Sequence, residues 1–497
     1  MSTARAVARG TTRLLAGLLS AKAFDFAFYL LLARRLGVQE FGRYTYSVSF
    51  TLLFTMLADF GVQMLFTREV SRTPDRVRGL LRQVIRVKLV LALVTFAATL
   101  GVSLAMGTPR GTLLLIAVLT GAMLVNSTAF LYENLLKSAG RAGAAGMSIV
   151  AQSATAVTVG VALVLSGFGA LGGACAYFLA AIVHLVVAAI WARDLWWKIK
   201  PTKENLRPVW PSWRALIKEA MPFAISWAFI TVYFRIDSVL LNLFKGSTDV
   251  GLYGSCYRLF EAFVLFSVAY RSVLFPVMAR AADGPAESLG VLCRKSFRLH
   301  LMFTVGVAVF MTFEAKQVIG VLLGPAYVAA APALVILMWA LPGAFMAGTL
   351  LHLLAAQRRQ SVSARAMAIT ALFNVMANLV LIPRFSLVGA AATTVASELL
   401  SFTLMFLAFS RTVPGIGLFG VARAPLVAGA IAGGALVLLS PLNPGGAAGL
   451  ALMAILAMSA YVLALVALGA LGRQDFELVQ AVLPAAFRPT RAGDRPS

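Results

Sequence analysis

Charged residues are scarce in this 497-residue chain. Asp, Glu, Lys and Arg together make up 12% of it, whereas they make up roughly a quarter of a soluble domain. Hydrophobic residues make up 60%, and the mean hydropathy is +0.87. This composition excludes a soluble globular domain and predicts an integral membrane protein.

Acidic residues are especially few: 19 Asp and Glu stand against 43 Lys and Arg, for a net charge of +24. In a soluble protein such an excess would indicate nucleic-acid binding. Here the basic residues lie in short segments between apolar runs, where they set membrane topology and face anionic lipid headgroups. We therefore expect membrane lipids, and no nucleic acid, as partners.

Cysteine and histidine are too few and too scattered to predict a disulfide framework or a metal site. The cysteines are Cys175, Cys256 and Cys293, without a CxxC spacing, and the histidines are His184, His300 and His352. Because each histidine stands alone on an apolar run, we expect packed core or interfacial side chains rather than a proton relay. Glu133, Glu314 and Glu398 fall near the ends of such runs, where we expect capping or snorkelling.

Catalytic motifs are absent as well. The chain has no GxSxG, no GxxxxGK[ST], no HExxH and no long polar segment that could form an extramembrane enzyme domain. We expect a protein that is not an enzyme, with no catalytic residue, no metal and no cofactor. Without a nucleotide-binding loop, energy coupling would come from an ion gradient, the membrane potential or the substrate's own gradient.

Apolar runs of the length that crosses a bilayer, about 20 residues, recur along the whole chain. We predict an all-α polytopic membrane protein with about fourteen transmembrane helices, namely 12–33, 44–66, 84–106, 112–136, 144–167, 170–192, 219–243, 250–278, 299–323, 328–353, 364–382, 387–410, 424–440 and 447–471. The predicted organisation is an N-terminal six-helix lobe (1–200), a cytoplasmic linker (201–218), a C-terminal six-helix lobe (219–411), an additional helix pair (412–472) and a cytoplasmic tail (473–497).

Loop charge predicts the orientation of these helices, because cytoplasmic loops carry excess Lys and Arg. With the N-terminus inside, the inner segments hold 32 of these residues, among them seven from Arg68 to Lys88, and the outer segments hold seven. The remaining four lie within predicted spans. This bias predicts cytoplasmic N- and C-termini and a multi-pass protein of the cell inner (cytoplasmic) membrane.

The two halves of the chain resemble each other. EFGRYTYS from Glu40 aligns with DVGLYGSC from Asp249 at an offset of 209, which pairs Gly42 with Gly251 and likewise Gly37 with Gly246. FGALGGA from Phe168 aligns with FSLVGAA from Phe385 at an offset of 217. Parallel repeats of this kind are related by an axis along the membrane normal and hold substrate between them.

Eight charged residues lie well inside the first, second, seventh and eighth predicted spans, although a charge at bilayer depth costs from about 2.5 to more than 10 kcal/mol. They are Lys22, Asp25, Asp59, Arg235, Asp237, Arg258, Glu261 and Arg271. Lys22 and Asp25, like Arg258 and Glu261, are three residues apart and so share a helix face. Asp59 and Arg271 have no opposite charge within one turn.

These eight residues admit two interpretations. They either form buried ion pairs that fix helix packing, or they line a polar pathway between the first, second, seventh and eighth spans. In a pathway, four cations would suit a phosphate or an acidic sugar, whereas carboxylates would dominate the pathway of a drug-cation pump. We select these residues as candidates for substrate binding and translocation.

Several short motifs together resemble a known family. They are LLARRLGVQEFGRYTY (31–46), ADFG (58–61), Arg68-Glu69, RID (235–237), VGLY (250–253) and GPAYVAAAP (324–332). In order and spacing, the chain from about residue 10 to 410 resembles the polysaccharide-transporter branch, the O-antigen flippases, of the multidrug/oligosaccharidyl-lipid/polysaccharide exporter superfamily.

The resemblance implies two six-helix lobes around a V-shaped central cavity that opens alternately to the two sides of the membrane. It implies transfer of an undecaprenyl-diphosphate-linked oligosaccharide, an O-antigen or related surface polysaccharide unit, from the inner to the outer leaflet. The cavity cations, here Lys22, Arg235, Arg258 and Arg271, would then meet the diphosphate or acidic sugars. A monomer that works beside a polysaccharide polymerase and chain-length proteins is the expected context.

Two relatives of this class remain as alternatives. Fourteen spans instead of twelve also resemble the lipid II flippase branch, whose additional helix pair forms a groove for the lipid tail, although its characteristic early sequence is absent here. A drug/cation antiporter of the same superfamily would share the fold. A glycan polymerase or ligase is disfavoured, because every predicted outer loop is short.

Overall fold

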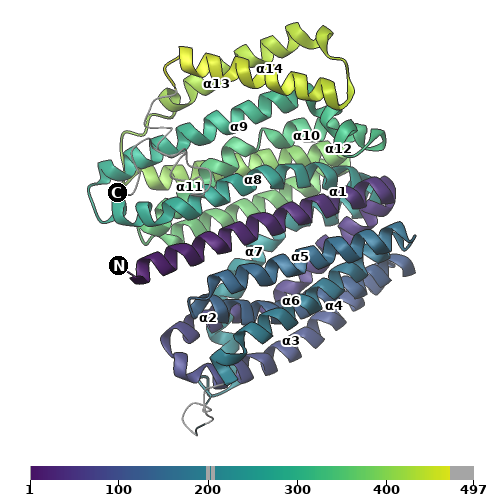
Figure 1. Ribbon diagram of the computed structural model, residues 1–497, viewed down its shortest axis with the longest axis vertical. Coiled ribbons are helices and arrows are strands. Elements are labelled where there is room, and N and C mark those ends of the chain that lie inside the picture. The colour runs from purple at the N-terminus through teal and green to yellow at the C-terminus, as the bar shows by residue number, and fades with distance from the viewer. Residues whose placement is uncertain (1, 198–201, 203–207, 471–497) are drawn as a thin grey trace, which may run out of the picture. The chain divides into compact units, whose positions relative to one another are not determined.

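The computed structural model describes residues 2–197, 202 and 208–470, with side chains from Gly17 onward, and its described elements are all helical (Figure 1). The helices are α1 (Ser2–Asp59), α2 (Val62–Arg72), α3 (Val77–Ala105), α4 (Arg110–Ser138), α5 (Ala142–Leu165), α6 (Gly169–Trp197), α7 (Trp213–Lys245), α8 (Ser247–Ala282), α9 (Ala286–Leu322), α10 (Ala331–Met338), α11 (Leu341–Ala356), α12 (Gln360–Ser410), α13 (Leu418–Leu439) and α14 (Gly446–Ala467). Short 3-10 helices η1 (Pro74–Arg76), η2 (Pro325–Ala330) and η3 (Ser440–Leu442) join some of them. The predicted tail, 473–497, lies outside the described residues.

The number of membrane segments agrees with the prediction. Within the described residues, 10 helices are long and apolar enough to span a membrane, and two bent helix pairs raise that number to 12. The 51 residues of α12 would extend about 77 Å as one helix, far more than the roughly 30 Å of hydrocarbon. Because the backbone is non-helical at Gly37 in α1 and at Ser386 in α12, each of these helices is two segments, which brings the total to fourteen.

The chain reverses at equivalent points of the two repeats. Gly37 (φ 73°) and Gly246 (φ 87°), which correspond at the offset of 209, both adopt the left-handed region that favours glycine. At the offset of 217, Gly169 (φ 54°) corresponds to Ser386 (φ 49°). The repeat seen in the sequence therefore reappears in the backbone, where it places helix boundaries at matching positions.

The described chain divides into two compact units. Unit 1 comprises Met1–Ser255 and Asn374–Ala390, and unit 2 comprises Cys256–Phe373 and Ala391–Ser497. In unit 1, α7 packs against α1 and α2. The lobe boundaries proposed from the sequence stay predictions.

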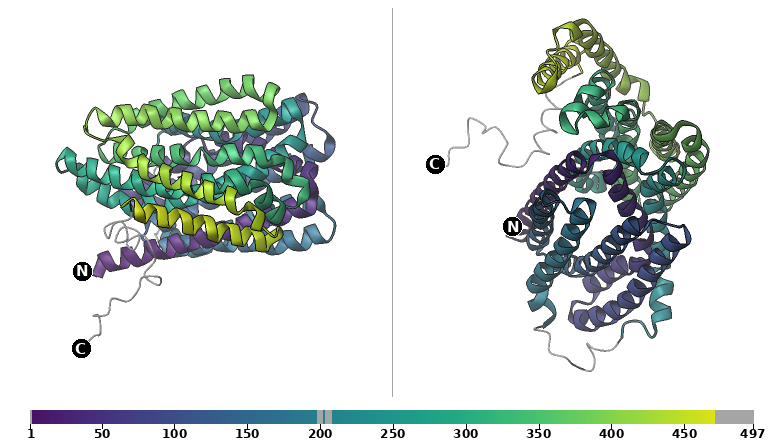
Figure 2. Two further views of the ribbon diagram at one scale, coloured as in Figure 1. Left: turned by 90° about the horizontal axis from the view of Figure 1, so that it is seen from above. Right: turned by 90° about the vertical axis from the view of Figure 1, so that its right-hand side faces the viewer.

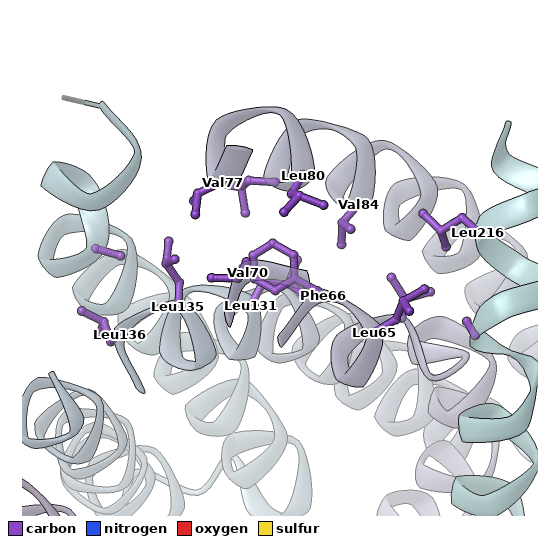
Figure 3. Packing of buried hydrophobic residues seen from close by; sticks show 14 of the residues in the cluster. Leu65, Phe66, Val70, Val77, Leu80, Val84, Leu131, Leu135, Leu136 and Leu216 are labelled. Carbon is purple, nitrogen blue, oxygen red and sulfur yellow. The ribbon is translucent and has the colours of Figure 1, made fainter. Parts of the chain in front are cut away.

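One apolar core of unit 1 gathers side chains from the six helices α2 to α7 (Figure 3). Phe66 of α2 lies among Leu80 of α3, Leu131 of α4 and neighbouring residues of the cluster, and all three are fully buried. The end of the predicted linker joins this core. Trp210 is buried in it, and the Gln83 side chain donates to the Trp210 carbonyl oxygen at 2.8 Å. Residues 208–212 thus attach to α3 before α7 begins.

Unit 2 contains the additional helix pair. Helices α13 and α14 pack against each other and against α9 (Figures 1 and 2). Met302 of α9 lies in one apolar cluster with Ala428 and Ala432 of α13 and Tyr461 of α14. The small residues allow close approach, as is typical of helix contacts in membranes. The pair is therefore an integral part of unit 2.

Two glycines in unit 1 bring α1 and the beginning of α8 into backbone contact. A Cβ at Gly42 would lie 1.7 Å from the carbonyl oxygen of Ser247, and a Cβ at Gly251 would lie 2.1 Å from that of Val38. Both the glycines and the residues they meet are related by the repeat offset of 209. The contact is therefore two-fold symmetric within one chain.

Candidate functional site

Lys22 and Asp25 form the ion pair that their spacing predicts. The Nζ and Oδ2 atoms lie 3.7 Å apart on α1, and the side chains are 59% and 48% exposed on the protein surface. Neither side chain is buried in the protein interior. Their role in a pathway stays a prediction.

Asp59 is paired with Lys88, a residue that the count of loop charges assigns to an inner loop. The Lys88 Nζ atom of α3 donates to Asp59 Oδ1 at 3.0 Å and to the Ser127 carbonyl oxygen at 2.9 Å. Counting Lys88 with the charges of an inner loop was wrong, because α3 begins at Val77 and Lys88 is only 5% exposed. Asp59 ends α1 just before Phe60 (φ 42°) and Gly61 (φ 71°), so the pair fixes the bend between α1 and α2.

Asp237 is buried in α7 and held by three donors. The Tyr253 hydroxyl donates to its Oδ2 atom at 2.6 Å, and the Ser238 backbone N–H and hydroxyl donate to its Oδ1 atom at 2.7 and 3.4 Å. Tyr253 is the tyrosine of the VGLY motif (250–253). Arg235 is partly buried two residues away and acts electrostatically on this carboxylate.

Arg258 and Glu261 also form the pair that their spacing predicts. Arg258 Nη1 donates to Glu261 Oε2 at 2.7 Å, with the side chains 32% and 30% exposed. This pair belongs to unit 2, whereas Lys22, Asp25, Asp59, Arg235 and Asp237 belong to unit 1. The chamber expected between the two halves stays a prediction.

Arg271 of α8 is partly buried in unit 2. Its Nη1 atom donates to Ser267 Oγ at 2.5 Å, its Nε atom is buried without a hydrogen-bond partner, and Glu398 of α12 acts on it electrostatically. The guanidinium rests on α11, where a Cβ at Gly348 would lie 2.1 Å from Nη1. Arg271 is thus a cation whose hydrogen-bonding capacity is not filled.

A polar cluster that was not predicted from the sequence lies between α4 and α6. His184 Nδ1 lies 2.7 Å from Asn126 Oδ1, and His184 Nε2 lies 3.4 Å from Glu133 Oε2. Glu133 is 2% exposed, so the capping or snorkelling expected of it was wrong. His184 is a buried core histidine, as expected, and so is His300, which packs beside Tyr270 and Phe345. Partners this far apart in sequence leave no local signal.

Within the described part of the chain, no cluster of three or more His, Cys, Asp or Glu could hold a metal ion.

A pocket of about 630 Å³ lies between α1, α5 and α6, lined by Gly17, Ser20, Met147 and Trp191 among others. Arg141 at its edge donates through both Nη atoms to the Asp194 carboxylate at 2.7 Å, and these bonds raise the pKa of Arg141.

The helices and the charges within them define a multi-pass membrane protein of the transporter type. The family model described as "Polysaccharide biosynthesis protein" matches residues 7–282, more than half of the chain. The chain belongs to this family, and the resemblance to polysaccharide transporters that the motifs indicate is confirmed.

Two archaeal relatives and one solved structure extend the comparison. The "Uncharacterized membrane protein MJ1068" of Methanocaldococcus jannaschii is 28% identical over 184 residues, which cover 37% of this chain and 36% of that protein. The "Probable low-salt glycan biosynthesis flippase Agl15" of Haloferax volcanii is 22% identical over 79% of this chain and 81% of that protein.

The structure titled "Lipid II flippase MurJ, inward closed conformation" superposes with a TM-score of 0.71 at 11% identity, covering 91% of this chain and 97% of that one. At this identity the match shows a shared fold. It assigns no substrate to this chain.

Proposed function

We propose that this protein is a flippase that moves an undecaprenyl-diphosphate-linked oligosaccharide, an O-antigen or related surface polysaccharide unit, from the inner to the outer leaflet of the cell inner membrane. The hydrated head of such a lipid cannot cross hydrocarbon unaided, because each unsatisfied polar group there costs several kcal/mol. A polar pathway that opens alternately to the two sides supplies the missing contacts while the prenyl chain stays in lipid.

One observation carries the proposal: in a chain of the polysaccharide biosynthesis family, cations recur inside the spans of both units. Lys22 and Arg235 belong to unit 1, and Arg258 and Arg271 belong to unit 2. Arginine suits a diphosphate because its planar guanidinium can donate two parallel hydrogen bonds. The glycan flippase of H. volcanii, which aligns over most of both chains, supports the same class of cargo.

Charge reversal tests the pathway. We expect Arg235→Glu and Arg258→Glu each to lower glycan export at least tenfold in a host that lacks its own flippase, with normal protein level in the membrane. Arg280→Glu is the matched control, because Arg280 lies exposed at the end of the same helix as Arg258. Full export by both reversed variants would defeat the assignment.

A charge swap separates substrate contact from helix packing. The double variant Arg258→Glu with Glu261→Arg keeps an ion pair at the same spacing on α8. If the pair only held the helix, the swap would restore export to the parental rate. We expect export to stay low, because the cation has moved one turn along the helix.

The substrate that the protein transports distinguishes the proposed function from its two alternatives. A lipid II-type flippase would restore peptidoglycan synthesis in a strain that lacks its own lipid II flippase, and a drug/cation antiporter would lower the accumulation of a cationic dye. We expect restored surface glycan and neither of these effects. The cytoplasmic termini, the monomeric state and the partnership with polymerase and chain-length proteins stay part of this proposal.

A further inference from the structure

Two buried titratable side chains, neither of them a candidate pathway residue, face each other between α4 and α6. His184 is 0% exposed and Glu133 2% exposed, and His184 Nε2 lies 3.4 Å from Glu133 Oε2. Neither of these two facing atoms has a hydrogen-bond partner. Buried polar atoms normally do have one, so the gap between them calls for a physical account.

The other side of the imidazole provides this account. Asn126 Oδ1 lies 2.7 Å from His184 Nδ1, and with the amide oxygen placed toward the ring, Nδ1 carries the hydrogen. In neutral histidine the opposite nitrogen, Nε2, is then an acceptor. A carboxylate oxygen is also an acceptor. Two acceptors of buried side chains therefore face each other, and a single proton between them would turn repulsion into a hydrogen bond.

The cluster is linked to the protein surface through Lys137. The other carboxylate oxygen of Glu133, Oε1, is paired with Lys137, one turn farther along α4, and that side chain is 37% exposed. The edge of the His184 ring contacts Phe130 at 5.6 Å, which closes the apolar side. The polar route by which a proton reaches the site therefore runs from the exposed Lys137 side chain along Glu133.

Several charged groups on the helices packed against α4 and α6 have partners of their own. Lys88 of α3 is bonded to Asp59 of α1 and to the Ser127 carbonyl oxygen. Arg68 and Glu69 of α2 are bonded to each other, and Arg68 is bonded also to Glu219 of α7. Arg141, which precedes α5, is bonded to Asp194 of α6. The cation paired with Glu133 is Lys137.

We propose that Glu133 and His184 form a binding site for a single exchangeable proton, which joins α4 to α6 when it is bound. With the proton present, the Nε2 to Oε2 contact is a charge-assisted hydrogen bond. Without it, the two acceptors repel and the helices lose this link. Resting on the proposed flippase function, the site would give the transport cycle a step that responds to a proton gradient.

The chain's own composition makes the site measurable, because it has only three histidines. Full-length protein labelled with ¹⁵N-histidine in lipid nanodiscs gives imidazole NMR signals that report protonation and tautomer. The His184 signal is the one lost in His184→Gln. We expect it to show Nδ1 protonated throughout and Nε2 protonated only when the site holds its proton.

Glu133→Gln is the decisive variant, since it keeps the size of the side chain and removes its charge. We expect proton binding at His184 to weaken about tenfold, or one pH unit. A His184 signal that stays in one protonation state across the pH titration, or that titrates identically in Glu133→Gln, would overturn the site. Glu314→Gln is the matched control, because Glu314 is buried in unit 2, and it should leave the His184 titration unchanged.

Coupling of proton binding to glycan export is measured in a separate experiment. In cells, we expect glycan export by the parent to follow external pH and export by Glu133→Gln to lose that response. Export by Glu133→Gln that follows pH as in the parent would defeat the coupling. If the chain proves to carry another cargo, the His184 titration still decides the site itself.

Discussion

At the scale of single residues, Arg271 and Gly348 depend on each other. The guanidinium occupies the space that a side chain at Gly348 would take, with Nη1 2.1 Å and Cζ 2.6 Å from the position of a Cβ. A glycine at this point of α11 is therefore a packing requirement of the cation. The requirement could not be read from the sequence, because the two residues lie on different helices.

We expect Gly348→Ala to displace the guanidinium and to lower glycan export severalfold, with a modest fall in thermal stability. The measurement is export together with the unfolding temperature in detergent. Gly434→Ala is the control, because a Cβ there meets nothing within 4 Å. If the collision with Arg271 is the cause, Gly348→Ala adds no further loss of stability in an Arg271→Ala background. Equal losses in both backgrounds would exclude this cause.

Removal of the Lys88 ammonium would leave the Asp59 carboxylate without its ion-pair partner. We expect Lys88→Met to lower the free energy of unfolding by about 3 kcal/mol, at the low end for a broken buried pair because Asp59 keeps 19% exposure. Lys88→Met combined with Asp59→Asn should recover most of the loss. Thermal unfolding of the parent and the two variants measures this, and no recovery in the double variant would show that the unpaired Asp59 carboxylate is not the cause of the loss.

At the scale of helices, the contact between α1 and α8 depends on the absence of side chains at two equivalent places. A Cβ at Gly42 or Gly251 would collide with a backbone oxygen, which cannot move as a flexible side chain would. We expect Gly42→Ala and Gly251→Ala to destabilise the protein to a similar extent, as measured by thermal unfolding. Gly101→Ala, in open space on α3, should be neutral or slightly stabilising. A neutral Gly42→Ala would contradict the close contact.

The positions of the helices were the part of the fold that the sequence predicted best, for a physical reason. A membrane span must be about 20 apolar residues long, and its ends carry charge or glycine, so both signals are local. The bend at Phe60 and Gly61 and the buried Lys88 were not predictable. Lys88 pairs with Asp59 from 29 positions away, and an apolar run that contains a lysine looks the same whether or not a partner faces it. The same holds for His184 and Glu133.

At the scale of the whole molecule, topology can be tested independently of substrate. We expect a reporter placed in the turn at Gly140 to face the cytoplasm and one in the turn at Gly107 to face outward, with both termini cytoplasmic. The reason is the concentration of Lys and Arg in alternate loops. Fusions active in opposite compartments would confirm that α4 crosses the membrane once between the two turns. The same compartment for both turns would contradict the predicted orientation.

The paired glycines also bear on the origin of the chain. Because Gly42 meets Ser247 as Gly251 meets Val38, each repeat offers the other the same surface and receives the same surface in return. Two identical subunits associate in this manner in a homodimer with a two-fold axis. An ancestral half-length protein could therefore have assembled as a dimer through this patch before gene duplication and fusion joined the two copies.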